Sequence, residues 1–195
     1  MSENWDLHAD GWDSNKDVVK YSELAFESLS KITNLKGLNI LDFGCGTGLL
    51  TEKLSTDANH IVSLDSSEKM ISVLKNKNLN NVSTITTELS KNTIENNDLL
   101  KTKFDLIVAS SVFAFLPNYE KTLSLLKTLL SPGGRIIQWD WLETEDTPGF
   151  GFTKIRIESA LRATGLKASS ISEPFTFKSN DSEMKVIMCV STDIE

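Results

Sequence analysis

The feature that most limits how this chain can fold is the run Ile-Leu-Asp-Phe-Gly-Cys-Gly-Thr-Gly at residues 40–48. A short apolar segment, Asn39 to Phe43, ends in glycines, and helical spacing of apolar residues resumes from Leu49 to Ser55. Glycine lacks a Cβ atom, so it adopts backbone angles that other residues resist and lets a ligand approach the main chain closely. The pattern predicts a strand, a tight turn and a helix, with free N–H groups at the start of the helix.

The rest of the chain continues this alternation of strands and helices. Apolar, β-branched runs predict strands at 61–64, 82–87, 104–109 and 135–140. Helical spacing predicts helices at 15–31, 66–74, 119–130 and 152–164, with a turn at 131–134. The Asn-rich stretch 76–97 predicts loops, with only weak helix before Lys101. Two last strands, 168–177 and 184–190, follow each other directly. We therefore expect a parallel sheet covered on both faces, with an antiparallel edge.

Length, charge and cysteine content exclude several classes of protein. A chain of 195 residues fits one domain, 1–195, and a net charge of −7 without a basic stripe counts against nucleic acid as a partner. Cys45 and Cys189 lie far apart, which predicts free thiols and a cytoplasmic location. His8 and His60 are isolated, so no metal site is expected. No apolar run has the length of a signal peptide or membrane span.

The glycine spacing narrows the kind of ligand. Nicotinamide enzymes use G-x-G-x-x-G after the first strand, whereas this turn reads G-x-G-x-G, with Asp42 two positions before its first glycine. A tight turn without any ligand is the alternative interpretation.

On these residues the chain resembles the class I, Rossmann-like S-adenosylmethionine-dependent methyltransferase family, in particular its small-molecule branch. The likeness runs from about Asn39 to Val190, and it also covers the Leu-Leu-Ser-Pro-Gly-Gly-Arg turn at 129–135. It implies a three-layer α/β/α, doubly wound fold whose seven-stranded, mostly parallel sheet has the order 3-2-1-4-5-7-6 and one antiparallel edge strand. Residues 1–35 would form a helical lid segment over the core 36–195.

The resemblance also assigns a set of cofactor-binding residues. The turn residues Asp42, Gly44, Cys45 and Gly46 would wrap the methionine and ribose parts of the cofactor. Asp65 ends the second strand, where a carboxylate can accept hydrogen bonds from both ribose hydroxyls, although capping of the next helix is an alternative role. The remaining implied residues lie beside the adenine or the cofactor's edge: Ser66, Met70, Glu88, Leu89, Ala109 and Ser110. For Glu88 a solvated loop acid is an equal alternative.

Four residues are candidates for contact with the methyl acceptor. Trp12 and Tyr21 belong to the N-terminal segment, although an aromatic helix face is also typical of a core. Phe115 stands where many relatives carry a histidine, so histidine-based chemistry is in doubt. Either Asp140 or its neighbour Trp141, at the end of strand five, is expected to touch substrate or to anchor the following loop.

These observations predict transfer of a methyl group from S-adenosylmethionine to a small-molecule acceptor, with S-adenosylhomocysteine as product, by a monomer or homodimer. No catalytic residue is assigned, because a sulfonium methyl is electrophilic enough for attack by a well-positioned nucleophile. A protein or nucleic-acid methyltransferase is an alternative, against which the short acidic chain counts. A non-catalytic S-adenosylmethionine-binding protein and a nicotinamide oxidoreductase are the others.

Overall fold

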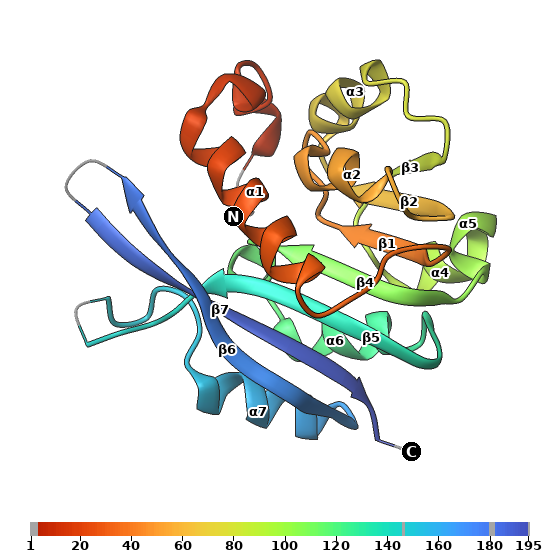
Figure 1. Cartoon of the computed structure of the whole chain (residues 1–195). Coiled ribbons are helices and arrows are strands. Elements are labelled where there is room, and N and C mark those ends of the chain that lie inside the picture. Colours follow the sequence, from red (N-terminus) through yellow and green to blue (C-terminus); the bar gives the residue numbers. More distant parts are fainter. Residues whose placement is uncertain (1–3, 146, 180–181, 195) are drawn as a thin grey trace.

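The structure, a computed structural model, describes residues 4–145, 147–179 and 182–194, and it is built around one seven-stranded sheet (Figure 1). The strand order is β3-β2-β1-β4-β5-β7-β6, as the resemblance implied. The strands are β1 (Asn39–Phe43), β2 (His60–Asp65), β3 (Val82–Thr86), β4 (Phe104–Ser110), β5 (Leu130–Trp141), β6 (Leu166–Ser179) and β7 (Ser182–Asp193). The first five run parallel, and β7 is antiparallel both to β5 and to the edge strand β6.

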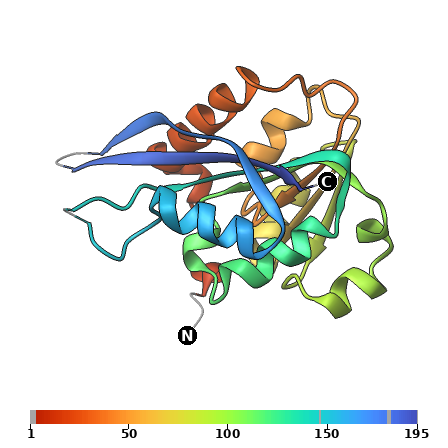
Figure 2. The same ribbon diagram turned by 90° about the horizontal axis from the view of Figure 1, so that it is seen from below.

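Helices cover both faces of the sheet. In Figure 1, α1, α2 and α3 lie above the sheet while α6 and α7 lie below it, and Figure 2 shows this lower layer from its outer side. The helices are α1 (Lys16–Ser30), α2 (Leu49–Leu54), α3 (Glu68–Asn76), α4 (Lys91–Asn96), α5 (Asp98–Lys101), α6 (Tyr119–Lys127) and α7 (Lys154–Ala163). Short 3-10 turns are η1 (Trp5–Leu7), η2 (Trp12–Ser14) and η3 (Phe113–Phe115). No helix of the described ranges is long and apolar enough to cross a membrane.

The alternation of side chains along each strand divides the core in two. On β1, Ile40 packs with residues of α1 and α2, whereas Leu41 and Phe43 pack with α6 and α7. Burying an aliphatic side chain of this size stabilises the fold by about 1.5–3 kcal/mol. Asp42 shares the face of Ile40, and this places its carboxyl beneath α2.

Polar caps explain where the helices begin. The side chains of Asn15, Ser67, Asn118 and Thr153 accept hydrogen bonds from backbone N–H groups in the first turns of α1, α3, α6 and α7. Each such cap is typically worth about 1 kcal/mol. The N-cap of α3, the helix after β2, is therefore Ser67 and not Asp65.

Two stretches differ from the sequence expectation. The predicted turn at 131–134 lies inside the range of β5, where Gly133 has φ +77° and the register with β4 shifts. In the second stretch, which runs from residue 76 to Lys101, the expected weak helix is replaced by two short defined helices, because Ser90 caps α4 and Asn97 caps α5. The Asn-rich composition that suggested loop thus contributes helix caps here.

Candidate functional site

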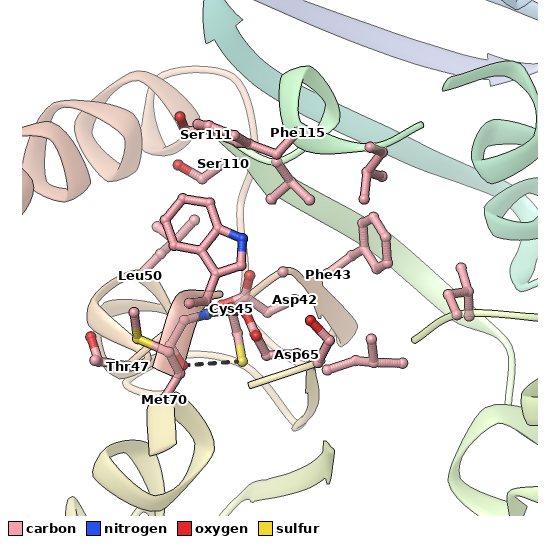
Figure 3. A pocket seen from close by; sticks show the side chains of 18 of the residues that line it. Asp42, Phe43, Cys45, Thr47, Leu50, Asp65, Met70, Ser110, Ser111 and Phe115 are labelled. Atoms are coloured by element: carbon pink, nitrogen blue, oxygen red, sulfur yellow. Dashed lines mark hydrogen bonds between the residues drawn. The ribbon is translucent and has the colours of Figure 1, made fainter. Parts of the chain in front are cut away.

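A cavity of about 800 Å³ opens at the carboxyl ends of the parallel strands. It lies where the strand order reverses between β1 and β4, the place where open α/β sheets bind ligands. In the view of Figure 3, Ser110 and Ser111 lie on one side of this space, and Thr47 and Met70 lie on the other. The cavity is large enough for a nucleoside cofactor together with a small second ligand.

The glycine turn forms the floor of the cavity. The N–H groups of Gly44 and Cys45 both donate to the carbonyl of Leu64, at 2.8 and 3.2 Å, and so hold the turn against the end of β2. Gly44 and Gly46 have φ of +69° and +54°. A Cβ atom on Gly44 would lie 2.4 Å from a methyl of Val112, whereas one on Gly46 would meet nothing within 4 Å. Gly44 is therefore required by packing, and Gly46 is the glycine that leaves open space for a ligand.

Asp65 joins the glycine turn to the end of β2. Its Oδ2 accepts from the N–H of Gly46 at 2.8 Å, and its Oδ1 accepts from the N–H of Ser67 at 2.9 Å. A carboxylate has about four acceptor positions, so each oxygen retains capacity for a hydroxyl donor. Asp65 lines the cavity. Since Ser67 caps α3, the helix does not need the Asp65 side chain as its N-cap.

Asp42 is a nearly fully buried carboxyl at the floor of the same cavity. Its Oδ2 accepts from the Thr51 hydroxyl at 2.6 Å. Burial raises the pKa of Asp42 to about 7; the Thr51 hydrogen bond opposes the rise and the Asp65 charge adds to it. This carboxyl therefore changes charge near neutral pH, unlike an ordinary aspartate.

The N-terminal segment, residues 4–15, is held against the cavity from outside. Asp13 accepts from the Thr47 hydroxyl at 2.5 Å and pairs with Lys77 at 2.8 Å. The ring of Trp5 stands edge-on to Phe115, with 4.9 Å between ring centroids. Trp5 and Trp12 both line the cavity.

Ser111 has an unusual backbone conformation at the end of β4. Its φ is +58°, a region that non-glycine residues seldom occupy, and its N–H donates to the carbonyl of Trp139 at 2.7 Å. Ser111 also lines the cavity. Strained backbone of this kind clusters at functional sites, where the surrounding structure enforces it.

Most of the predicted site residues meet at this cavity. The cofactor candidates that line it are Asp42, Gly44, Cys45, Gly46, Asp65, Ser66, Met70, Glu88, Leu89 and Ser110. Of the acceptor candidates, Trp12, Tyr21 and Phe115 line it. Ala109 does not, because its side chain is fully buried in the core under α6 and α7. Burial raises the pKa of the Cys45 thiol, which keeps it in its neutral, unreactive form.

Asp140 is not among the residues that line the cavity, so the structure does not bring it together with the other acceptor candidates. Its carboxyl accepts from Gln138 Nε2 at 3.0 Å and from the N–H of Ala114 at 3.4 Å, and Gln138 in turn accepts from the hydroxyl of Tyr119. Burial raises the pKa of Asp140 to about 8, while these hydrogen bonds lower it. Because side chains alternate along a strand, Trp141 faces the cavity instead.

Several lining residues were not found from the sequence. Ser22 lies one helical turn after Val18 on α1, and both line the cavity. The apolar stripe of that helix could therefore have indicated Ser22 as a lining residue. Phe177 comes from β6, at the far end of the chain, and no local pattern marks it. Asn118 and Lys121, near the start of α6, are likewise brought in by the fold.

The fold and the site together define a Rossmann-like protein that binds a nucleotide-type ligand over a glycine turn, with a carboxylate on the neighbouring strand. Residues 41–136 match the family described as a methyltransferase domain. The chain belongs to the class I S-adenosylmethionine-dependent methyltransferase family.

Comparison with individual proteins agrees with this family. The ubiquinone biosynthesis O-methyltransferase of Xylella fastidiosa is 30% identical over 135 residues, which cover 68% of this chain and 52% of that protein. The chain spans about half the length of the curated relatives it matches.

Two solved structures share the fold. A putative methyltransferase from Haloferax volcanii, in complex with the Trm112 methyltransferase activator, has a TM-score of 0.79 at 15% identity and covers both chains fully (100% of each). Magnesium protoporphyrin IX methyltransferase from Synechocystis PCC 6803, with bound SAH, has a TM-score of 0.67 at 19% identity, covering 89% of this chain and 83% of that one.

Proposed function

We propose that this chain transfers a methyl group from S-adenosylmethionine to a small-molecule acceptor and releases S-adenosylhomocysteine. The observation that carries the proposal is the Asp65 carboxylate, held in the cavity wall by the Gly46 N–H directly beside the open glycine turn. Family membership supports the reaction class. The printed name of the Xylella relative, an O-methyltransferase of ubiquinone biosynthesis, supports a small molecule as acceptor.

The donor set fits this cofactor. Asp65 offers two oxygens for the ribose hydroxyls. The open space beside Gly46 leaves room for the methionine part of the cofactor. We propose that Met70 and Leu89 supply apolar surface for a flat base and that Glu88 accepts from its amino group, since all three line the cavity. Asp42 adds negative charge at the floor. When bound, the cofactor supplies a methyl group on a positively charged sulfur, which is the electrophile.

The remaining residues position the reactants and exclude water. The segment pinned by Asp13 covers the cavity, with Trp5 and Trp12 as apolar walls. Binding two reactants in fixed orientation is the main source of rate in such a transfer. Ala109 and Asp140 are given no role in this proposal, because their side chains are buried and do not line the cavity.

Calorimetric titration with S-adenosylmethionine and S-adenosylhomocysteine tests the proposal, with NADH as the unrelated control. Saturable binding of both adenosyl compounds and none of NADH is expected. No heat at millimolar S-adenosylhomocysteine would contradict the proposal. Incubation of the protein and cofactor with a metabolite extract, followed by mass spectrometry for products that gain one methyl group, then identifies the acceptor.

The proposal extends to the setting of the protein. We propose a cytoplasmic monomer or homodimer that does not act on nucleic acid, in agreement with the net charge of −7 and two free cysteines. We also propose that residues 1–35 serve as a lid segment of a single domain. Light scattering after gel filtration measures the oligomeric state, and an electrophoretic shift with DNA or RNA would contradict the partner assignment.

A further inference from the structure

Two hydroxyl groups on α1 line the cavity without a hydrogen-bond partner among the residues that the structure describes. Tyr21 is 9% exposed and Ser22 is 6% exposed, and neither Tyr21 Oη nor Ser22 Oγ bonds to any of the described residues. Both residues line the cavity at its α1 side. A buried polar group without a partner costs stability, and at the wall of a cavity a bound ligand or an ordered water satisfies it.

The ring of Tyr21 is held firmly, so its hydroxyl has a defined position. It packs against Trp141 at 5.2 Å, Phe175 at 5.5 Å and Phe177 at 6.3 Å between ring centroids. Trp141 and Phe177 also line the cavity. Burial raises the pKa of Tyr21 well above its ordinary value, so the hydroxyl stays neutral. Aromatic walls of this kind suit a flat, apolar ring that carries a polar group.

The charges around the cavity restrict the acceptor further. The described lining residues include the carboxyl groups of Asp17, Asp42, Asp65 and Glu88, against a single cation, the exposed Lys121. No arginine or histidine is among them. A carboxylate or phosphate acceptor would therefore lack the paired donors that such anions need. A neutral alcohol or phenol must lose its proton during the transfer, whereas an amine attacks through its lone pair and needs no base beforehand.

We infer that the hydroxyl oxygens of Tyr21 and Ser22 bind the N–H groups of the methyl acceptor, and that the acceptor is an uncharged aromatic amine. This inference rests on the proposed function. The amine uses its hydrogens for the two oxygens, which leaves its lone pair free for attack. The nitrogen forms a bond to the methyl carbon while the carbon–sulfur bond breaks, and that electron pair stays on sulfur. The positive charge moves from sulfur to nitrogen, and the product later releases a proton to water.

Nothing in the cavity has to remove a proton before this transfer. The charge that develops on nitrogen lies among aromatic faces and carboxylates, which favour a cation. The same surroundings disfavour an anionic acceptor, so the arrangement separates acceptors by charge as well as by shape.

The test compares three probes of one shape: naphthylamine, naphthol and naphthoate, each substituted at the same ring position. Their binding is measured by tryptophan fluorescence and calorimetry at saturating S-adenosylhomocysteine. The amine is expected to bind tightest and the carboxylate weakest. Equal affinity for all three, or preference for the carboxylate, would overturn the acceptor class.

Two variants test the residues. Tyr21→Phe and Ser22→Ala each remove one unpaired oxygen, so they should leave the melting temperature unchanged or raise it, and weaken naphthylamine binding about threefold to tenfold. The matched control is Tyr119→Phe, which removes the hydroxyl that donates to Gln138 outside the cavity. It should lower the melting temperature without changing naphthylamine affinity. Unchanged affinity in both α1 variants would overturn the inference.

Titration with S-adenosylhomocysteine first, and with the naphthyl probes second, distinguishes failure of the proposed function from failure of the inference about the acceptor. If S-adenosylhomocysteine itself does not bind, the proposed function fails, and the inference fails with it. If it binds normally to both α1 variants and the probes show no charge preference, only the inference about the acceptor fails.

Discussion

The backbone N–H of Gly46 donates to Asp65 Oδ2 over 2.8 Å, which joins the turn after β1 to the acid at the end of β2. The two residues are 19 positions apart, yet they form one wall of the cavity. Asp65 thus both shapes the glycine turn and lines the cavity.

Removing that carboxylate is expected to weaken cofactor binding. Asp65→Ala should reduce the affinity for S-adenosylhomocysteine by about 1–3 kcal/mol, because ribose hydroxyls lose a charged acceptor. Calorimetry measures the change. The control is Asp105→Asn, since Asp105 accepts from the N–H of Asn39 and from Ser131 at the opposite end of β4. The control should lose stability and keep its affinity; native affinity in the alanine variant would count against the ribose role.

Cofactor affinity is expected to depend on the charge of Asp42. Because burial raises its pKa to about 7, the free protein holds a proton there below that pH. A cationic ligand favours the ionised carboxyl, so binding releases the proton, and affinity for S-adenosylmethionine should rise with pH up to about pH 7, by at most about tenfold per unit. Titrations in buffers of different ionisation enthalpy count the protons. Asp42→Asn provides the baseline, and an identical pH profile in that variant would refute the assignment.

Stability should fall as pH rises, in part because of Asp140. Its pKa is about 8 in the folded protein and near 4 when unfolded, so the folded state binds the extra proton between these values. The contribution of Asp140 to the free energy of unfolding is therefore at its full value below about pH 4, and it is lost as the pH rises through about 8. Urea unfolding between pH 5 and pH 9 measures the slope.

Asp140→Asn is the matching variant for that slope. Its side chain cannot ionise, so its unfolding free energy should decline less steeply with pH than that of the native chain. Cofactor affinity should stay the same, because Asp140 does not line the cavity. An unchanged slope would show that the carboxyl titrates with an ordinary pKa.

The N-terminal segment should loosen when Asp13 is removed. Asp13→Ala breaks the bonds to Thr47 and Lys77, whose combined loss is expected to lower local stability by about 1 kcal/mol. Faster proteolysis before α1 and a red-shifted tryptophan emission are the readouts, since Trp5 and Trp12 lie in this segment. The exposed Asp10 offers the control, Asp10→Ala. Equal cleavage rates in the two variants would mean that Asp13 does not hold the segment.

Much of the fold was predictable because its signals are local. The strand at Asn39–Phe43 and the glycine turn after it follow from apolar runs and backbone chemistry within ten residues. The cap on Ser67 likewise depends on its own first turn of helix. The sequence predicted a turn at 131–134, whereas the glycines there lie within β5. A glycine pair can end a strand or bend it, and the strand beside it decides which; here that strand is β4, at Phe104.

What the sequence by itself determined is the order of elements, the glycine turn and the acid that ends β2. Only the tertiary structure decided that Trp141 faces the cavity and Asp140 does not. It also decided that the hydroxyls of Tyr21 and Ser22 have no partner there among the described residues. The physical reason is that β5 is covered on both faces, so apolar and polar residues do not alternate along it. The sequence therefore does not show which of its side chains point to which face of the sheet. Which side chain meets a ligand is then set by packing between segments that are distant in the chain.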